Sequence, residues 1–396
     1  VTLERVVQVP ALEEDLEATF TVDGEHVDDG PVPDIDDRRI RPDDLFMINS
    51  TSGTTGLPKC VLHTQNRWLY FHQVATRNGE LTDTDVFMGA IPAPFGFGLW
   101  TSHFTPIVLG APTIVRHRFD AVTAMDDIER HGVSVLCCVS TQFLMMLNEP
   151  TLEARDLSSL RVMFTGGEAV PAERAKRFEH TTGCQVLQFY GSNETGLLTG
   201  TRTTDSDRVR FETAGRVEPA MHVRMYDVDG AHQVEGEGRP ACRGPATCLG
   251  YLDQEANTKL FTPDGWMLMG DLCTIDDDGN LRVTGRTSDI IIRGGKNISA
   301  NVVEDEVGTH PSVALAAAVP KPDEVFGERV HVYLELTPGS EPITLDELRE
   351  HLRERGTSVE VIPESLEILD ELPRSSGAKI AKGELAQRIR RETGVT

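Results

Sequence analysis

A run of hydroxyl and glycine residues near the start of the chain ends in a single lysine. Residues 50–59 read Ser-Thr-Ser-Gly-Thr-Thr-Gly-Leu-Pro-Lys and directly follow the apolar segment 45–48. Glycines let consecutive backbone N–H groups face one anion, hydroxyl groups add donors, and lysine adds positive charge. The run therefore predicts a phosphate-binding loop, with the candidate residues Thr51, Ser52, Gly53, Thr54, Thr55, Gly56 and Lys59. The alternative is an exposed linker, although linkers seldom follow a buried strand.

The order of residues in this loop argues against the commonest phosphate-binding loop. In a P-loop, Ser or Thr directly follows Gly-Lys, so that its hydroxyl group reaches magnesium. Here Lys59 follows Pro58 and precedes Cys60, and that hydroxyl group is missing. A P-loop nucleoside triphosphatase is therefore not expected.

Composition limits the classes of protein to which the chain can belong. Its 396 residues exceed one ordinary core, so two or more domains are expected. The formal net charge of −25 disfavours binding to nucleic acid and to anionic membranes. No apolar run approaches the roughly 20 residues of a membrane span, and no signal peptide is recognised, so a cytoplasmic protein is expected. The seven cysteines form no Cys-x-x-Cys pair, which argues against zinc and disulfide bonds.

Apolar runs alternate with helical patterns from about residue 45 to residue 200, as in a layered α/β domain. Asp120 is a candidate N-cap for a helix that Gly132 ends, since a side-chain acceptor begins a helix and a glycine often ends it. A buried strand over 133–139 follows. The same unit then recurs as a strand over 160–164, a helix over 171–182 and a strand over 186–189.

The pattern changes beyond residue 215, where strands alternate with tight turns. Asp229-Gly230 and Gly279-Asn280 are typical of hairpin turns, so a β-rich subdomain is expected. After residue 288 a small α+β unit follows, with strands near 313–319 and 330–336. Its helix is predicted to begin at Thr344 in a capping box.

Four motifs together resemble those of the adenylate-forming superfamily, which includes acyl-CoA synthetases, adenylation domains and luciferases. Beside the hydroxyl-rich loop, they are residues 190–194 (Tyr-Gly-Ser-Asn-Glu), 265–272 (Gly-Trp-Met-Leu-Met-Gly-Asp-Leu) and 372–380 (Leu-Pro-Arg-Ser-Ser-Gly-Ala-Lys-Ile). The resemblance covers roughly residues 40–390. It implies an α/β fold with a large N-terminal domain over 1–287 and a small, mobile C-terminal α+β domain over 288–396. Because 49 residues precede Ser50, the leading subdomain of the superfamily is expected to be shortened or absent.

The resemblance also implies roles for individual residues. Tyr190 is expected to stack on adenine, Glu194 to hold Mg²⁺, and Asp271 and Arg286 to contact the ribose. Lys379 matches the lysine of adenylation, and Lys59 joins it as a catalytic residue. The other implied nucleotide contacts are Gly167, Glu168, Gly191, Asn193, which stands where threonine is usual, and Thr195.

Further residues are assigned to the hinge, the thiol channel and the acyl pocket by the same resemblance. Ser288 stands at the hinge position, where Asp or Lys is common. Gly294 and Gly295 are expected to line the channel for the pantetheine of coenzyme A, because glycine permits close approach of a thin ligand. Candidate acyl-pocket residues are Phe95, Gly96, Phe97, Gly98, Ser140 and Thr141. An aromatic stretch of this kind is as often core as pocket.

The resemblance implies an ATP-dependent acid–CoA ligase that uses ATP, Mg²⁺ and coenzyme A. It is most similar to synthetases for alicyclic, aryl or medium-chain acids, which indicates a place in fatty or aryl acid metabolism. Two alternatives stay open: an adenylation enzyme that loads an acyl or peptidyl carrier protein, and a non-catalytic adenylate-binding protein. The departures Asn193, Met269 and Ala378 keep the second alternative open. The acid and the oligomeric state, a dimer included, also stay open.

Replacing Lys379 tests the catalytic assignment. Lys379→Ala is expected to slow acyl-adenylate formation by on the order of 10² or more, because a charge partner of the transition state is lost, while ATP binding largely survives. ATP–pyrophosphate exchange measures the rate, with Lys296→Ala, a predicted surface lysine, as the control. Unchanged exchange in Lys379→Ala would remove Lys379 from the mechanism.

Overall fold

The structure is a computed structural model, and its described residues form two compact units, 1–41 and 42–396. The described residues are 7–8, 21–22, 25–26, 40–51, 59–91, 96–116, 118–167, 170, 172–287, 289–294, 296–374 and 380–393. In the first unit, three short antiparallel strands pair in the order β1-β2-β3. They are β1 (Val7–Gln8), β2 (Thr21–Val22) and β3 (Glu25–His26).

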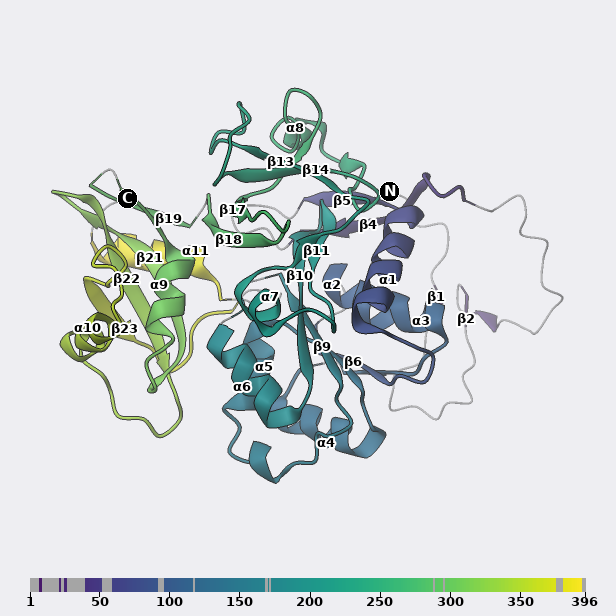
Figure 1. Ribbon diagram of the computed structural model, residues 1–396, viewed down its shortest axis with the longest axis horizontal. Coiled ribbons are helices and arrows are strands. Elements are labelled where there is room, and N and C mark those ends of the chain that lie inside the picture. The colour runs from purple at the N-terminus through teal and green to yellow at the C-terminus, as the bar shows by residue number, and fades with distance from the viewer. Residues whose placement is uncertain are drawn as a thin grey trace. The chain divides into compact units, whose positions relative to one another are not determined.

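A seven-stranded sheet lies at the centre of the large N-terminal domain, in the order β12-β11-β10-β9-β8-β6-β7 among the described residues (Figure 1). Strands β10, β9, β8, β6 and β7 run parallel, whereas β11 and β12 are antiparallel additions at one edge. The strands are β6 (Phe87–Gly89), β7 (Thr113–Val115), β8 (Val135–Cys137), β9 (Val162–Gly166), β10 (Gln185–Ser192), β11 (Gly196–Gly200) and β12 (Arg216–Val217). The predicted strands over 160–164 and 186–189 correspond to β9 and β10.

Helices cover both faces of this sheet because each buried strand presents apolar residues alternately to either side. Trp68 and Phe71 of α1 pack with Phe164 on one face, and Met125 of α4 packs with Met163 on the other. Figure 1 shows α1 on one side of the sheet and α5 and α6 on the other. The helices are α1 (Gln65–Gly79), α2 (Gly96–Leu99), η2 (a π-helix, Trp100–Phe104), α3 (Thr105–Leu109), α4 (Ala121–His131), α5 (Ser140–Leu147), η3 (Leu152–Ala154), α6 (Ala172–Thr182) and α7 (Asp207–Glu212).

Helix α4 begins and ends where the sequence predicts. The Asp120 carboxylate accepts a hydrogen bond from the Thr123 N–H (2.8 Å), and Gly132 ends the helix in the left-handed conformation. Strand β8 is shorter than the predicted 133–139. Its carboxyl end is diverted into α5, where the side-chain oxygen of Gln142 accepts the N–H of Val139 at 3.1 Å.

The β-rich part contains three smaller sheets, with orders β15-β5-β4, β13-β14-β16 and β17-β18. The predicted turns at 229–230 and 279–280 are present, and Gly230 and Gly279 have positive φ angles of 74° and 81°. The elements are β4 (Leu45–Ser50), β5 (Cys60–Thr64), β13 (His222–Tyr226), β14 (Arg239–Arg243), β15 (Gly250–Tyr251), α8 (Gln254–Asn257), β16 (Met267–Leu268), β17 (Asp271–Ile275) and β18 (Leu281–Arg286).

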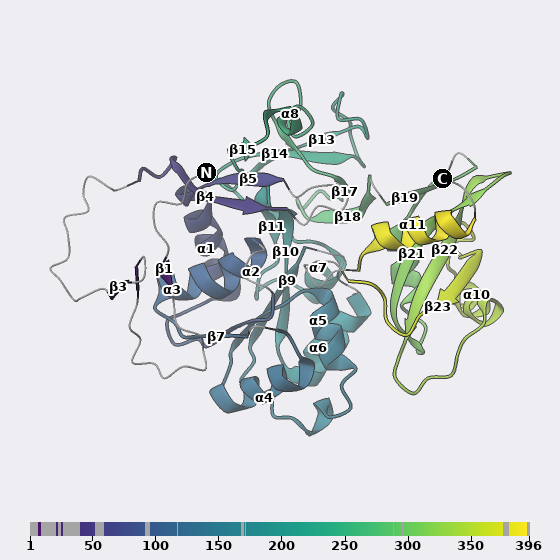
Figure 2. The ribbon, with the colours of Figure 1, turned by 180° about the vertical axis from the view of Figure 1, so that it is seen from behind.

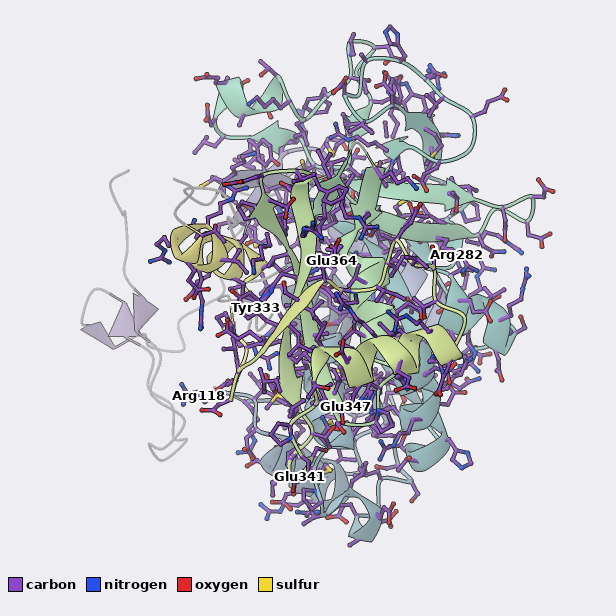
Figure 3. All side chains as sticks on the ribbon, turned by 90° about the vertical axis from the view of Figure 1, so that its left-hand side faces the viewer. Arg118, Arg282, Tyr333, Glu341, Glu347 and Glu364 are labelled. Carbon is purple, nitrogen blue, oxygen red and sulfur yellow. The ribbon has the colours of Figure 1, made fainter. Side chains whose placement is uncertain are left out.

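The small C-terminal domain has its own sheet, order β20-β19-β22-β21, with β23 added to β22. Helices α9 and α10 pack on one face of this sheet. Helix α11 packs on the other face, which is turned toward the viewer in Figure 2. Figure 3 labels Tyr333 on β22 and Glu347 in the first turn of α10, where the Thr344–Glu347 capping box is confirmed. The elements are β19 (Ile290–Arg293), β20 (Lys296–Ser299), α9 (Ala300–Val307), β21 (Val313–Asp323), β22 (Gly327–Leu336), α10 (Leu345–Glu354), β23 (Ser365–Ile368) and α11 (Lys382–Glu392).

The predicted α/β class, with a large N-terminal and a small C-terminal domain, is confirmed. The boundary at residue 288 stays a prediction. Within the described part of the chain, every helix is too short or too polar to span a bilayer.

Two substitutions on α4 test the packing of this helix against the sheet. Met125 is fully buried, so Met125→Ala is expected to lower the free energy of unfolding by about 2–5 kcal/mol. Val122 on the same helix is 36% exposed, and Val122→Ala is expected to change it by less than about 0.5 kcal/mol. Urea unfolding followed by tryptophan fluorescence reports on the large domain, which contains all three tryptophans. Equal losses in the two variants would contradict the packing described.

Candidate functional site

The carboxyl ends of three neighbouring parallel strands meet at one edge of the central sheet. Gly167 follows β9 with a positive φ of 80°, Ser140 and Thr141 begin the helix after β8, and Tyr190 lies near the end of β10. Ligands bind at this edge in open α/β folds. The edge therefore collects predicted nucleotide and acyl-pocket residues from three separate parts of the sequence.

The turn from β10 to β11 is held by glycine and by a serine hydroxyl group. A Cβ atom on Gly191 would lie 1.7 Å from the carbonyl oxygen of Gly196, so only glycine fits this irregularity in the strand. The Ser192 Oγ accepts the N–H groups of Glu194 (3.2 Å) and Thr195 (3.1 Å). These bonds fix the backbone of Glu194 just beyond the sheet edge.

Tyr190, Asp271 and Arg286 come together although they are far apart in the sequence. The Tyr190 hydroxyl group donates to Oδ2 of Asp271 at 2.9 Å, and Arg286 Nε donates to Oδ1 at 2.8 Å. Asp271 and Arg286 are directly opposite in the β17–β18 pair. Burial, followed by the Asp271 charge, raises the pKa of Tyr190 well above its usual range, so the phenol stays protonated and donates.

The Asp271 carboxylate has acceptor capacity beyond these two bonds. A carboxylate offers about four lone-pair sites, and Tyr190 and Arg286 occupy one on each oxygen. Vicinal hydroxyl groups of a ribose are donors that suit the remaining sites. The geometry agrees with the role predicted for Asp271, which stays a prediction.

Glu194 and Lys59 share a third residue that the sequence reasoning missed. The Tyr251 hydroxyl group donates to Oε1 of Glu194 at 2.6 Å, and Lys59 Nζ lies 4.9 Å from the centroid of the Tyr251 ring. Tyr251 reaches this position because β15 pairs with β5, which begins one residue after Lys59. No local motif marks Tyr251, since its partners are set by strand pairing.

The two ends of the predicted phosphate loop are joined. The Thr51 N–H donates to the Lys59 carbonyl oxygen at 2.9 Å, and the Lys59 N–H donates to Thr51 Oγ1 at 3.1 Å. Strands β4 and β5 thus form a hairpin with the loop at its tip. The loop residues Ser52, Gly53, Thr54, Thr55 and Gly56 lie outside the described residues.

A buried arginine beneath the Glu194 turn was also missed. Arg67 of α1 is 1% exposed, and its Nε donates to the Ala246 carbonyl oxygen at 2.8 Å. Its terminal nitrogens donate to the carbonyl oxygens of Asn193 (3.1 Å) and Glu194 (3.2 Å). One of them also bonds His63 Nδ1 at 2.6 Å. Burial, followed by the Arg67 charge, lowers the pKa of His63 to about 3, so the ring is neutral and Nδ1 accepts.

The residues present fit a magnesium ion that is shared with phosphate groups. No cluster of three acidic, His or Cys ligands occurs in the described part of the chain, so an all-protein cage is not indicated there. Mg²⁺ is commonly held by one or two carboxylates together with substrate phosphates, and an outer hydrogen bond orients the carboxylate. Glu194, oriented by Tyr251, has this arrangement.

Three other predicted residues, Asn193, Gly96 and Thr195, lie in or against the turn that follows β10. Asn193 Nδ2 lies 3.4 Å from the Ser50 carbonyl oxygen, while its Oδ1 is buried with no hydrogen-bond partner. A Cβ atom on Gly96 would lie 2.9 Å from that Oδ1, so the start of α2 closely approaches the turn. Thr195 is buried, and its hydroxyl group accepts the Ser192 N–H at 3.0 Å, while its predicted phosphate contact stays a prediction.

Phe97 of the predicted acyl pocket is partly buried and packs against the core of the large domain. Phe97 lies edge-on to Phe189 at 6.5 Å, and Gly98 is buried. Gly294 has a positive φ of 57° and donates its N–H to the Phe326 carbonyl oxygen at 2.8 Å. The predicted residues Phe95, Glu168, Ser288, Gly295 and Lys379 lie outside the described residues, and their roles stay predictions.

Comparisons with known proteins give two family models that match this chain. Residues 2–252 match the family model described as AMP-binding enzyme, and residues 302–379 match the AMP-binding enzyme C-terminal domain. A medium-chain fatty-acid–CoA ligase of Escherichia coli is 31% identical over 88% of this chain and 62% of its own length. A salicyl-AMP ligase/salicyl-S-ArCP synthetase of Mycobacterium tuberculosis is 33% identical over 89% of this chain and 63% of its own. The chain therefore spans just under two thirds of these curated relatives.

A solved structure extends the likeness to a bound intermediate. The o-succinylbenzoate CoA synthetase of Bacillus subtilis, in complex with its acyl-adenylate intermediate, is 29% identical with a TM-score of 0.75. The alignment covers 87% of this chain and 69% of that one. Since the family model of the AMP-binding enzymes alone matches well over half of the residues, the chain belongs to that family, within the adenylate-forming superfamily.

Proposed function

We propose that this protein activates a carboxylic acid with ATP and transfers the acyl group to the thiol of coenzyme A. The observation that carries the proposal is the convergence of Tyr190, Asp271 and Arg286 beside the Glu194 turn. Asp271, the candidate acceptor for ribose hydroxyl groups, is thereby bonded to Tyr190, which lies four residues before Glu194, a carboxylate suited to a phosphate-bound cation. The relatives that form acyl adenylates or CoA thioesters support the same reaction.

The first half-reaction brings two anions together. A carboxylate oxygen attacks the α-phosphorus, the bond from that phosphorus to the bridging oxygen breaks, and pyrophosphate leaves with the electron pair. Lys59 and the hydroxyl loop would neutralise phosphate charge, and Lys379 would approach on the small domain. Bound Mg²⁺ would supply further charge neutralisation, with Glu194 as its protein ligand.

In the second half-reaction a thiolate attacks the acyl carbon, and AMP leaves with the electrons of the acyl–oxygen bond. The thiol must approach from a side that Lys379 would obstruct. Rotation of the small domain about Ser288 would remove Lys379 and present Gly294 and Gly295 instead. One site would then serve both half-reactions.

A second candidate is loading of a carrier protein rather than coenzyme A. The relative that is a salicyl-S-ArCP synthetase matches at 33% identity, and the fatty-acid–CoA ligase matches at 31%. Both acceptors present a pantetheine thiol, so the residues described favour neither. Alicyclic, aryl and medium-chain acids are the substrate classes to be tried first.

ATP–pyrophosphate exchange across aliphatic, alicyclic and aromatic acids tests the reaction and the substrate class together. Exchange is expected with at least one class, with AMP as the nucleotide product once a thiol is added. Thioester assays with coenzyme A and with a pantetheinylated carrier protein identify the acceptor. ADP as product would contradict the proposal, and nucleotide binding without exchange for any acid would favour a non-catalytic adenylate-binding protein.

Replacing Asp271 tests the nucleotide site. Asp271→Asn is expected to weaken AMP binding by about 10- to 100-fold, because hydrogen bonds to a charged group contribute roughly 1.5–3 kcal/mol. Isothermal titration calorimetry measures the affinity.

Asp264→Asn is a matched control, because Asp264 also accepts a tyrosine hydroxyl group (Tyr226, 2.8 Å) and pairs with an arginine (Arg224, 3.1 Å). Its AMP affinity is expected to equal that of the wild type. Equal AMP affinity in Asp271→Asn and in the wild type would show that the nucleotide lies elsewhere.

A further inference from the structure

Tyr251 contacts both of the phosphate-side residues predicted on the large domain. Its hydroxyl group donates to Glu194 Oε1 at 2.6 Å, while its ring lies 4.9 Å from Lys59 Nζ. The two contacts use different parts of one rigid side chain, and Tyr251 itself is buried. A single side chain therefore contacts both the carboxylate of Glu194 and the ammonium group of Lys59.

The orientation of the Tyr251 hydroxyl group is settled by its surroundings. An ionised carboxylate only accepts hydrogen bonds, whereas the Tyr251 phenol carries one O–H donor. It can therefore only donate to the Glu194 carboxylate, which holds one carboxylate oxygen and directs the other.

Arg67 holds the backbone of the same turn from the opposite side. It donates to the carbonyl oxygens of Asn193 and Glu194 and is anchored to Ala246 and His63. The Cys248 N–H donates to the same Glu194 carbonyl oxygen at 2.8 Å. Burial lowers the pKa of Arg67 only to about 10, so the guanidinium stays charged at neutral pH. A buried charge of this kind persists only when its donors are satisfied.

We propose that Tyr251 and Arg67 are positioning residues that hold Glu194 ready for a divalent cation and space it from Lys59. The inference rests on the proposed function only in taking Glu194 and Lys59 as the residues that meet the phosphates of ATP. Outer hydrogen bonds to a metal-binding carboxylate commonly change metal affinity 10- to 100-fold. Tyr251 would act through Glu194 and Lys59 and would not itself touch the reacting atoms.

Tyr251→Phe removes the hydroxyl group and keeps the ring. The increase in ATP affinity caused by Mg²⁺ is expected to fall by about 10-fold, as for other outer partners of a metal ligand. AMP affinity and ATP affinity without Mg²⁺ are expected to stay at the wild-type values. Isothermal titration calorimetry of ATP with and without Mg²⁺, and of AMP, measures all three quantities without relying on turnover.

Tyr251→Leu removes both the ring and the hydroxyl group. Comparing it with Tyr251→Phe therefore isolates the contact of the ring with Lys59. This variant also loses the contact with Lys59. Its ATP affinity without Mg²⁺ is therefore expected to be about two- to five-fold lower than that of Tyr251→Phe and of the wild type, the size of an exposed cation–π contact. Arg67→Lys loses the fork of donors to Asn193 and Glu194 and is expected to reduce the Mg²⁺ effect in the same direction as Tyr251→Phe.

Two matched controls make the same Tyr→Phe and Arg→Lys substitutions at positions outside the candidate site. Tyr226→Phe removes a hydroxyl group that donates to Asp264 at 2.8 Å, and Arg210→Lys alters an arginine that is 3% exposed and pairs with Glu179. Neither is expected to change the response to Mg²⁺. If Arg67→Lys does not fold, Tyr251→Phe alone decides the proposal.

The outcomes separate this inference from the proposed function. An unchanged Mg²⁺ effect in Tyr251→Phe, an equal loss of AMP and MgATP affinity, or a wild-type protein that does not respond to Mg²⁺ would overturn the inference. A wild-type protein that binds MgATP but gives no pyrophosphate exchange would overturn the proposed function, and the binding measurements would still decide the role of Tyr251.

Discussion

The hydrogen bond from Tyr190 to Asp271 joins the central sheet of the large domain to the β17–β18 hairpin at the candidate site. Tyr190 lies near the end of β10 in the central sheet, and Asp271 begins β17 of the β17–β18 hairpin 81 residues later. The bond is partly buried and charge-assisted, and Arg286 stabilises the carboxylate from the neighbouring strand. The bond places the Asp271 carboxylate beside Tyr190, four residues before Glu194, and a backbone bond from the Val217 N–H to the Gly279 carbonyl oxygen (3.1 Å) joins the same two sheets at another point.

Around this contact the polar groups are satisfied mainly by backbone carbonyl oxygens and by tyrosine hydroxyl groups. Arg67 bonds three carbonyl oxygens and a neutral histidine, which leaves the carboxylate of Glu194 unpaired with the buried arginine. An ion pair between them would neutralise Glu194 and reduce its attraction for a cation. Because Arg67 bonds only the backbone of the turn, the negative charge of the Glu194 side chain stays available to a ligand.

Much of the fold could be predicted because its signals are local. Asp120 and Gly132 bound α4, Thr344 begins α10, and glycines with positive φ form the predicted hairpin turns. Strands β9 and β10 could be read as apolar runs because the sheet is covered on both faces. The shorter β8 could not be foreseen, because a side chain of the next helix takes its last donor.

The site was predicted where motifs are contiguous and missed where partners are distant. Tyr190 and Glu194 belong to one short motif, whereas Tyr251 meets Glu194 across 57 residues and Arg67 meets Asn193 across 126. Such pairs follow from strand pairing and helix packing, which no local pattern encodes. Thr195 follows the same motif directly, and its hydroxyl group is used within the turn, where it accepts the Ser192 N–H.

The direct pairing of Asp271 with Arg286 has a consequence for the exposed turn that joins their strands. Side chains alternate between the two faces of a hairpin, so a shift of one residue would send Asp271 to the wrong face. The turn holds the alignment through Asp276, whose carboxylate accepts the Asn280 N–H at 2.8 Å. Loss of a single amino acid from this surface turn would thus dismantle the nucleotide-facing end of the hairpin, several residues away, so its length is as constrained as the identity of the aspartate.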